Sequence, residues 1–131
     1  MNGRAASGRL LLVEPQFVLR RTVSSMARQL GLAEVHEATT AAAAGRLLLE
    51  QRFDALLIAL DDDGGALLLL ERLRTGQWPQ TADLPVAAMA SACGVELALR
   101  LKELNVTRLL LKPFKVRGVL EAISALGAPE R

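Results

Sequence analysis

The sequence predicts an α/β fold: a doubly wound parallel sheet of five strands, flanked by five helices in a three-layer α/β/α sandwich. Short apolar runs recur along the chain, and the clearest of them, residues 53–60, suits a strand buried on both faces. Segments with helical spacing of apolar residues separate these runs, as in parallel strands joined by crossover helices. At 131 residues, the chain is long enough for one domain with a full core.

The first strand and the first helix are expected within residues 10–30. Residues 10–13 form an apolar run that Pro15 closes, because proline cannot donate a hydrogen bond to a central ladder. Residues 17–30 carry apolar side chains near helical spacing, and Gly31 ends the segment. The side chains expected on the apolar side of this helix are Phe17, Val18, Val23, Met26, Ala27 and Leu30.

An edge strand, a helix, the central strand and another helix are expected next. Residues 33–38 alternate apolar and polar types, which indicates a half-exposed edge strand with His36 in solvent. Thr39 is expected to cap a helix that reaches residue 49. Residues 67–74 follow the central strand as a helix. Its four successive leucines span about 300° of the helix circumference, so at least one of them should be exposed.

The last part of the chain adds two more strands and two more helices. Residues 84–90 form a strand, after which Ser91 is expected to cap a helix that reaches residue 104. Residues 106–111 and 115–126 form the last strand and the last helix. The side chains expected on the apolar side of the helix that ends at residue 104 are Val95, Leu97, Ala98 and Leu101.

Composition argues against several classes of protein. The net charge is +2 and the basic residues are spread along the chain, which gives no support for nucleic-acid binding. No apolar stretch is long enough to span a membrane, and a cytoplasmic location is expected. Cys93 is the single cysteine, so it forms no disulfide within the chain. We expect a flexible leader over residues 1–8, a domain over 9–126 and a tail over 127–131.

The predicted topology brings charged residues together at one edge of the sheet. Glu14 follows the first strand, residues 59–63 end the third, and Lys112 follows the fifth. The carboxyl ends of parallel strands meet at the same edge, where ligands bind in such sheets. Carboxylates suit Mg²⁺ and an ammonium stabilises a phosphoryl oxygen, so this set could hold both. The alternative is that these charges merely neutralise one another.

Over residues 9–126 the chain resembles the receiver domain of bacterial two-component response regulators, the CheY-like family. This resemblance implies the sheet order 2-1-3-4-5, as in flavodoxin-like folds, and a cis bond between Lys112 and Pro113. The matching segments are residues 10–14, 20–21, 37–38, 53–58, 84–86 and 112–114, of which the last is the most specific.

The resemblance also implies that most of the phosphorylation machinery is missing. In that family, an Asp that ends the third strand is phosphorylated, an acidic pair after the first strand helps to hold Mg²⁺, and a Thr or Ser and an aromatic residue respond. Only the first acid, Glu14, and the lysine, Lys112, keep their character in this sequence. The other matching positions hold Pro15 for the second acid, Ala59 for the acceptor, Ala90 for the hydroxyl and Leu109 for the aromatic residue.

Asp61 is the alternative acceptor. It lies two residues past Ala59, so it shares the same strand phase one pleat further on. The spacing from Phe53 and from the following helix both favour Ala59 as the matching position. If a metal binds, the ligands would be Glu14 and Asp61. We expect that one of these two carboxylates otherwise pairs with Lys112, because a buried and unpaired ammonium is costly.

These patterns predict a single-domain pseudo-receiver, which is not an enzyme, has no cofactor, and binds other proteins without depending on phosphorylation. The expected partners are a histidine kinase, a phosphotransferase, an output protein or a second copy of the chain. The alternative is a phosphorelay receiver that uses Asp61 with Mg²⁺, and a third reading is a sensor of a small anion or nucleotide. Residues expected to contact partners are Leu68, Arg100, Arg108, Leu109, Lys115 and Arg117.

Overall fold

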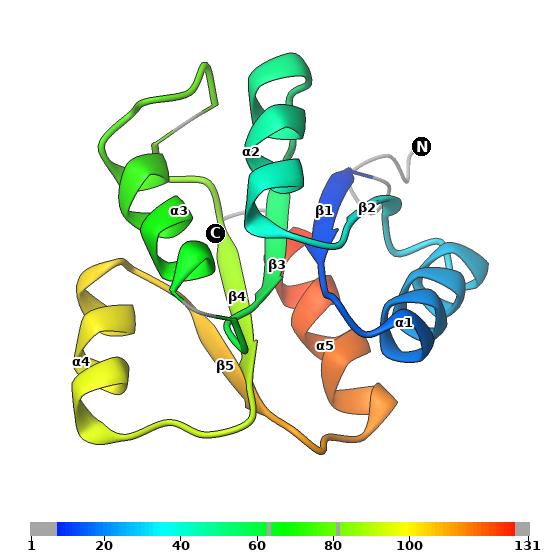
Figure 1. Cartoon of the computed structure of the whole chain (residues 1–131). Helices are drawn as coiled ribbons and strands as arrows, with labels where there is room; N and C mark the ends of the chain where they lie inside the picture. Colours follow the sequence, from blue (N-terminus) through cyan, green and yellow to red (C-terminus); the bar gives the residue numbers. More distant parts are fainter. Residues whose placement is uncertain (1–7, 63, 81, 128–131) are drawn as a thin grey trace.

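The computed structural model describes residues 8–62, 64–80 and 82–127. Five parallel strands form one sheet in the order β2-β1-β3-β4-β5, which is the predicted order (Figure 1). Strands and helices alternate along the whole described chain. The elements are β1 (Arg9–Val13), α1 (Phe17–Gln29), β2 (Glu34–Ala38), α2 (Ala41–Glu50), β3 (Ala55–Ala59), α3 (Gly65–Arg74), β4 (Val86–Ala90), α4 (Val95–Glu103), β5 (Arg108–Leu111) and α5 (Val116–Gly127).

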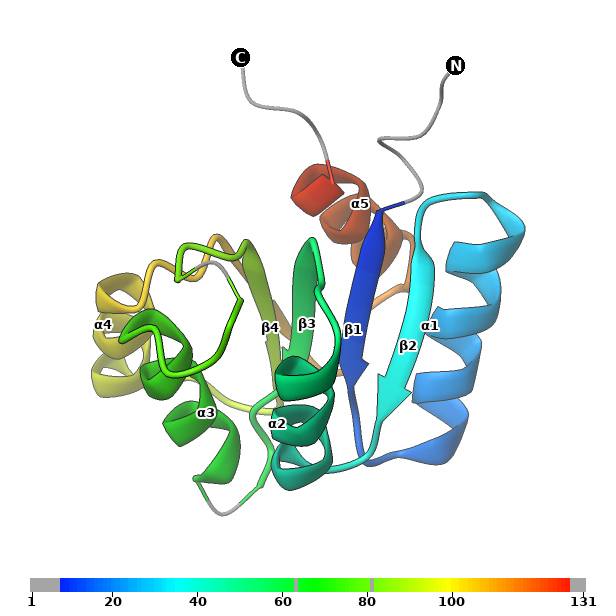
Figure 2. The ribbon, with the colours of Figure 1, turned by 90° about the horizontal axis from the view of Figure 1, so that it is seen from above.

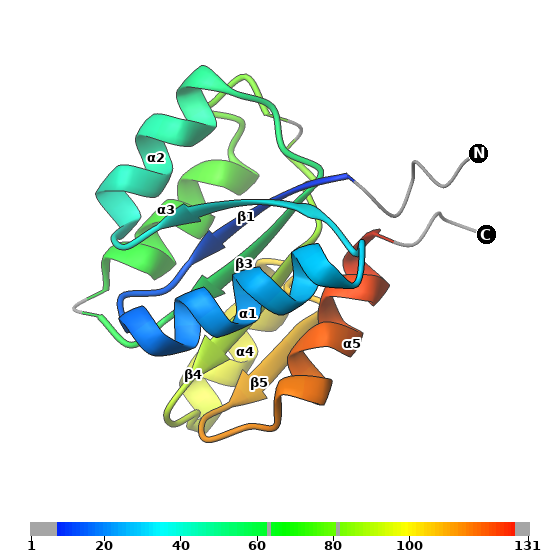
Figure 3. The same ribbon diagram turned by 90° about the vertical axis from the view of Figure 1, so that its right-hand side faces the viewer.

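The sheet separates two layers of helices. Helices α2, α3 and α4 lie on one face, and α1 and α5 lie on the other (Figures 2 and 3). The protein has two hydrophobic cores, one on each face of the sheet, and successive residues of the central strands pack alternately into one and the other. Leu56 and Ile58 pack on the side of α2 and α3, while Leu57 and Ala59 pack on the side of α1 and α5. All residues of β3 and β4 are buried, which confirms the prediction of strands covered on both faces.

Three predicted helix starts are wrong by a few residues. The cap of α2 is Thr40 and not Thr39, because β2 continues through Ala38 and the Thr40 side chain accepts a hydrogen bond from Ala43 N at 3.0 Å. Helix α3 begins at Gly65. Ser91 does not cap α4, which begins at Val95; the Ser91 backbone N–H donates instead to a carboxylate of the β3 loop.

Several side chains expected in the core lie in solvent. Phe17, Val18 and Leu30 are exposed, because α1 buries a narrower stripe through Val23 and Ala27. In α4, Val95 and Ala98 are also exposed, since α4 contacts the core through Leu101 and, partly buried, Leu97. The expectation for the four leucines of α3 is confirmed, because Leu68 is 48% exposed.

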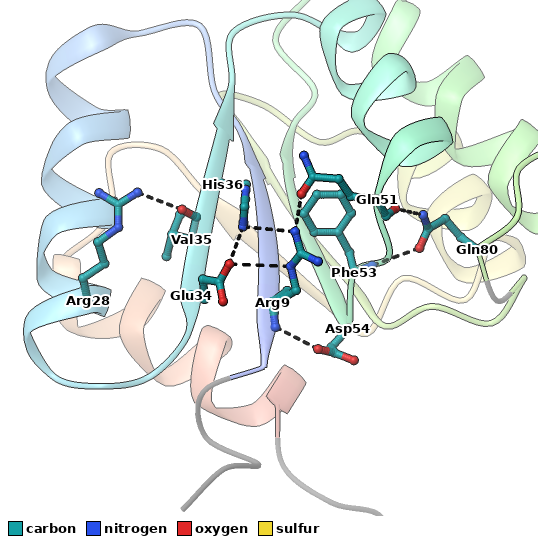
Figure 4. Close-up of polar contacts among 9 residues, drawn as sticks. All are labelled: Arg9, Arg28, Glu34, Val35, His36, Gln51, Phe53, Asp54 and Gln80. Carbon is teal, nitrogen blue, oxygen red and sulfur yellow. Dashed lines mark hydrogen bonds and ion pairs between the residues drawn. The ribbon is translucent and has the colours of Figure 1, made fainter.

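The amino ends of the strands hold a polar network around Arg9 (Figure 4). His36 is half-buried there and not free in solvent as predicted: its Nε2 lies 2.7 Å from Glu34 Oε2, and its ring meets Phe53 edge-on at 5.5 Å. The Arg9 guanidinium lies over the Phe53 ring, 5.5 Å from its centre, and its Nη2 is 3.5 Å from His36 Nε2. Arg9 Nε is buried without a hydrogen bond among the described residues, 3.6 Å from Glu34 Oε2. The other contacts join these side chains to one another, so we assign the network a structural role.

The described residues bear on two further expectations. Gly8 already belongs to the folded part, since its carbonyl accepts a hydrogen bond from Glu34 N at 2.9 Å, and α5 includes Gly127. The rest of the predicted leader and tail, residues 1–7 and 128–131, lies outside the described residues. Within those residues, none of the helices combines the length and the apolar character that crossing a membrane requires.

Candidate functional site

Three charged side chains meet at the carboxyl edge of the sheet, as the sequence predicts. Glu14 follows β1, Asp61 follows β3 by two residues, and Lys112 follows β5. Lys112 Nζ lies 2.8 Å from Glu14 Oε1 and 2.9 Å from Asp61 Oδ2. The expected pairing of the lysine with a carboxylate is therefore present, and both carboxylates take part in it.

The backbone positions Lys112 over the end of the neighbouring strand. Its N–H donates to Ala90 O at 2.8 Å, which extends the pairing of β5 with β4 beyond Leu111. The Lys112–Pro113 peptide bond is cis, as the resemblance implies. The chain turns away from the sheet at this point, and only 10% of the lysine side chain is exposed.

Glu14 is a completely buried carboxylate with its oxygens satisfied. Oε1 receives the Lys112 ammonium, and Oε2 accepts a hydrogen bond from Gln16 N at 2.9 Å. Its backbone carbonyl accepts from Arg20 Nη1 at 3.0 Å, and the Arg20 Nε is 3.0 Å from Glu37 Oε1. A buried carboxylate is tolerated only with such partners, so Glu14 and Lys112 depend on each other.

Asp61 also has both oxygens engaged. Oδ2 faces Lys112, and Oδ1 accepts a hydrogen bond from Ser91 N at 2.7 Å. Burial raises the pKa of Asp61, but the hydrogen bonds from Lys112 and Ser91 outweigh it and leave the pKa below its ordinary value. Burial lowers the pKa of Lys112, yet its bonds to Glu14 and Asp61 leave that pKa above its ordinary value. Asp61 and Lys112 are therefore both charged at neutral pH.

The resemblance assigns the acceptor position to Ala59 and the hydroxyl position to Ala90, and neither side chain has an oxygen. Ala59 and Ala90 are buried, at 4% and 2% exposure. Beside Ala59, a hollow of about 430 Å³ is lined in part by Pro15, Ala59 and Asp61, together with the start of α2. Apart from Asp61 and Asp62, its lining offers no carboxylate from the described residues.

Asp62 has a different task from Asp61. Its Oδ1 accepts a hydrogen bond from Gly64 N at 3.1 Å and its Oδ2 accepts one from Ala66 N at 2.9 Å. Negative charge is favourable at this end of a helix, because the first N–H groups have no partner within the helix. Asp62 therefore accepts hydrogen bonds from N–H groups at the start of α3, whose N-cap residue is Gly64. Asp63, the third acid of the run, lies outside the described residues.

The residues present do not fit a Mg²⁺ ion in the observed arrangement. Glu14 and Asp61 are the carboxylates that the sequence offers as ligands, and the ammonium of Lys112 occupies the space between them. Pro15 has no carboxylate to add. Within residues 8–62, 64–80 and 82–127, no cluster of three or more His, Cys, Asp or Glu side chains is suited to a metal ion. The lysine itself supplies the positive charge of the site.

The residues expected to contact partners differ in their exposure to solvent and in whether they already form ion pairs. Arg100 is already paired, because its guanidinium bonds Glu71 of α3 at 2.8 Å and Glu103 at 2.9 Å. Leu109 is half-buried and packs against the core below α2, α3 and α4. The remaining basic residues of the prediction are exposed: Arg108, Lys115 and Arg117.

Exposed apolar residues on α4 and β5 were missed by sequence reasoning. Val95, Leu99 and Leu111 are 75%, 58% and 52% exposed. Val95 had been expected to face the core, and nothing in the local pattern distinguishes Leu111 from the half-buried leucines beside it in β5. Helix α4 and the edge strand β5 are neighbours in the fold (Figure 1). Their exposed side chains add apolar area to the surface that carries Arg108.

No protein-family model matches the chain, and no curated protein sequence matches it. Several solved structures do match the chain in fold. The non-phosphorylated HemR receiver domain from Leptospira biflexa is 25% identical, with a TM-score of 0.81 over 95% of this chain and 98% of that one. The chemotaxis protein CheY4 of Vibrio cholerae is 20% identical, with a TM-score of 0.80 over 92% and 99%. A response regulator from Thermotoga maritima is 19% identical, with a TM-score of 0.77 over 92% and 97%.

Proposed function

From the CheY-like receiver fold, we propose that this chain is a signalling module that acts by binding other proteins and does not depend on phosphorylation of an aspartate. One observation carries the proposal: the Lys112 ammonium is held by Glu14 at 2.8 Å and by Asp61 at 2.9 Å. Lys112 therefore has no need of a phosphoryl group as its counter-ion. Ala59, at the position that matches the acceptor, has no oxygen to phosphorylate.

The parts that would respond to a phosphoryl group are also replaced. By the resemblance, a hydroxyl at the end of β4 and an aromatic residue in β5 move when the acceptor is modified. Ala90 has no hydroxyl, and Leu109 is an aliphatic side chain packed on the core. The residues that build the sheet and its two helical layers are intact. A protein of this kind presents one conformation of its surface to a partner.

We place the partner surface on α4, β5 and α5. Exposed Leu99 and Leu111 supply apolar area, while exposed Arg108, Lys115 and Arg117 supply positive charge. Apolar anchors surrounded by charge are the usual composition of a protein interface. A histidine kinase, a phosphotransferase, an output protein or a second copy of the chain would each meet this surface.

The alternative is a working receiver that uses Asp61 with Mg²⁺. Its support is that Asp61 contacts Lys112, as an acceptor would. Against it, the second oxygen of Asp61 is bound to Ser91 N, and the lysine ammonium lies between the two possible metal ligands. A sensor of small anions at this edge has less support, because two carboxylates already neutralise Lys112.

Phosphorylation by a small donor separates the two proposals. The chain is incubated with acetyl phosphate and Mg²⁺, and its intact mass is measured beside that of a phosphorylatable receiver treated identically. We expect no phosphate adduct on this chain. An adduct that disappears in Asp61→Asn would refute the proposal and establish the alternative. An adduct that persists in Asp61→Asn would mean that another residue accepts the phosphoryl group, which would refute both the proposal and the Asp61 alternative.

A further inference from the structure

A second surface, on the other side of the molecule from α1 and α5, has the character of a binding groove. It lies between α2 and α3, which run next to each other on one face of the sheet (Figures 1 and 2). Its volume is about 410 Å³, and its lining is mostly apolar or small. The side chains used below are Arg46, Leu49, Leu68, Arg72 and Trp78, together with Gly45, which all line this α2–α3 groove.

Apolar side chains from both helices border the groove and remain in contact with water. Leu49 of α2 is 60% exposed and Leu68 of α3 is 48% exposed. Gly45 of α2 lies next to the indole, because a Cβ built there would be 3.5 Å from Trp78 Cζ2, an ordinary contact distance. The indole is therefore part of the floor. The groove is therefore lined by aliphatic and aromatic side chains, runs between two helices and is open to solvent.

The charges of the groove are all of one sign among the described residues. Arg46 of α2 and Arg72 of α3 both line it, both are exposed, and neither forms an ion pair with a described residue. In contrast, the largely buried Arg20 and the partly exposed Arg100 each lie within 3.0 Å of a carboxylate. The lining includes no acidic residue. Two guanidinium groups, one on each helix, are thus available to carboxylates of a partner.

We propose that the α2–α3 groove binds an amphipathic helix of a partner protein, with an apolar stripe directed at Leu49, Leu68 and Trp78 and acidic residues on both flanks. The proposal goes beyond the proposed function, because it adds a second binding surface to the one on α4, β5 and α5. A groove between two helices accepts a third helix through apolar residues spaced three and four apart. Arg46 and Arg72 lie where acidic flanks would pass, and bidentate pairing with carboxylates is the favoured geometry of arginine.

A second copy of the chain fits this groove less well than an acidic partner. In a symmetric dimer, the same patch meets itself, so the arginines of the two copies would approach one another. Juxtaposed like charges oppose association. A second copy could instead place the carboxyl edge of its sheet in the groove. The carboxylates at that edge, Glu14 and Asp61, are already paired with Lys112 and so are not available to the arginines. Charge complementarity therefore favours an acidic segment of a different protein.

Trp78 provides the measurement. It is the only tryptophan, and the chain has no tyrosine, so the intrinsic emission of the protein reports on the groove. The probe is a synthetic helical peptide of about 16 residues, with leucines spaced three and four apart, glutamates only at the positions that flank the leucines, and alanine elsewhere. The control peptide has lysine in place of every glutamate. We expect a saturable change of Trp78 emission with the glutamate peptide, and an affinity at least about tenfold weaker for the lysine peptide.

Charge-reversal variants assign the binding to the groove. Arg46→Glu with Arg72→Glu should weaken the glutamate peptide at least about tenfold and strengthen the lysine peptide. The matched control, Arg52→Glu with Ser25→Glu and Gln29→Glu, makes the same change of net charge at exposed positions outside the groove and outside the surface of α4, β5 and α5, and it should leave both affinities unchanged. All of these positions are exposed, so each variant is expected to fold, which circular dichroism checks.

Three results would overturn the proposal: no saturable change with the wild-type chain, equal affinity for the two peptides, or an equal loss in the control variant. Sedimentation equilibrium of the wild type gives a fourth. If the chain self-associates and Arg46→Glu with Arg72→Glu abolishes this, the occupant is a second copy and not an acidic helix. The phosphorylation assay is independent of all four, so failure of the groove and failure of the proposed function are distinguishable.

Discussion

The carboxyl edge of the sheet and the α2–α3 groove use charge in opposite ways. At the edge, Lys112 is almost buried between two carboxylates, and Glu14 is completely buried. In the groove, Arg46 and Arg72 are exposed and form no ion pair with a described residue. Charges that neutralise one another inside a protein hold its structure, whereas unpaired surface charges are free to select a partner. The comparison therefore separates the residues that stabilise the fold from those that recognise another molecule.

The largest expected effect is at the edge. Lys112→Met leaves Glu14 buried without its counter-ion, which should lower the free energy of unfolding by about 3–5 kcal/mol in urea denaturation. Adding Glu14→Gln to Lys112→Met should recover part of this loss, because the buried charge is then removed. Lys115→Met at an exposed position is the control and should change the value by less than about 0.5 kcal/mol. A loss in Lys112→Met no larger than in the control would break the comparison.

Asp61→Asn should have a smaller effect that depends on pH. It weakens the bonds to Lys112 and Ser91, for a loss of about 1–2 kcal/mol at pH 7. Since the pKa of Asp61 is lowered in the folded state, its contribution is present above the ordinary Asp pKa of about 3.9 and is lost as pH falls through the folded value. The wild type and the variant should therefore converge in acid. Unfolding curves at several pH values test this, and a difference that persists in acid would contradict it.

Gly45→Ala should stabilise the protein by about 0.5–1 kcal/mol. Gly45 lies inside α2 with an ordinary helical backbone, where alanine is the better helix former. The new Cβ would meet Trp78 Cζ2 at 3.5 Å and Leu69 Cδ1 at 3.8 Å, both normal contacts. Thermal unfolding followed by circular dichroism measures the gain. A destabilised variant would mean that the groove has no room for a methyl group above Trp78.

The smallest expected effect belongs to the groove charges. Arg46→Glu with Arg72→Glu should change the free energy of unfolding by less than about 0.5 kcal/mol, because both side chains are exposed and form no ion pair with a described residue. The same variant should nevertheless lose the acidic peptide. Urea denaturation beside the Trp78 titration makes this comparison. A loss of several kcal/mol would show that these arginines support the fold and would remove the contrast between the two regions.

The fold could be predicted because its central strands are buried on both faces. That burial demands continuous apolar runs, and β3 and β4 show them plainly. Helix starts were less predictable. Thr39 and Thr40 are equally good caps by type, and the choice depends on where β2 ends. Exposure of Phe17 depends on how far α1 extends past its contacts with the sheet, which local periodicity does not record.

More of the candidate site than of the groove could be predicted from the sequence. Glu14 and Lys112 end strands whose order follows from the resemblance, so their approach was expected, and the pairing of Asp61 was one of the stated possibilities. The groove joins two separate helices and the loop after α3, and only Leu68 among its residues drew attention in the sequence. Arg46 and Trp78 come together only when α2, α3 and the following loop pack, and no short sequence motif predicts this packing.

The bond between Lys112 and its two carboxylates has a consequence for regulation. Under the proposed function, Lys112 has a permanent counter-ion within the chain, so a stimulus adds no phosphoryl group and a phosphatase has none to remove. In such a module, the strength of the output follows how many copies the cell makes and how long each one survives. Control would then pass from modifying enzymes to transcription and proteolysis.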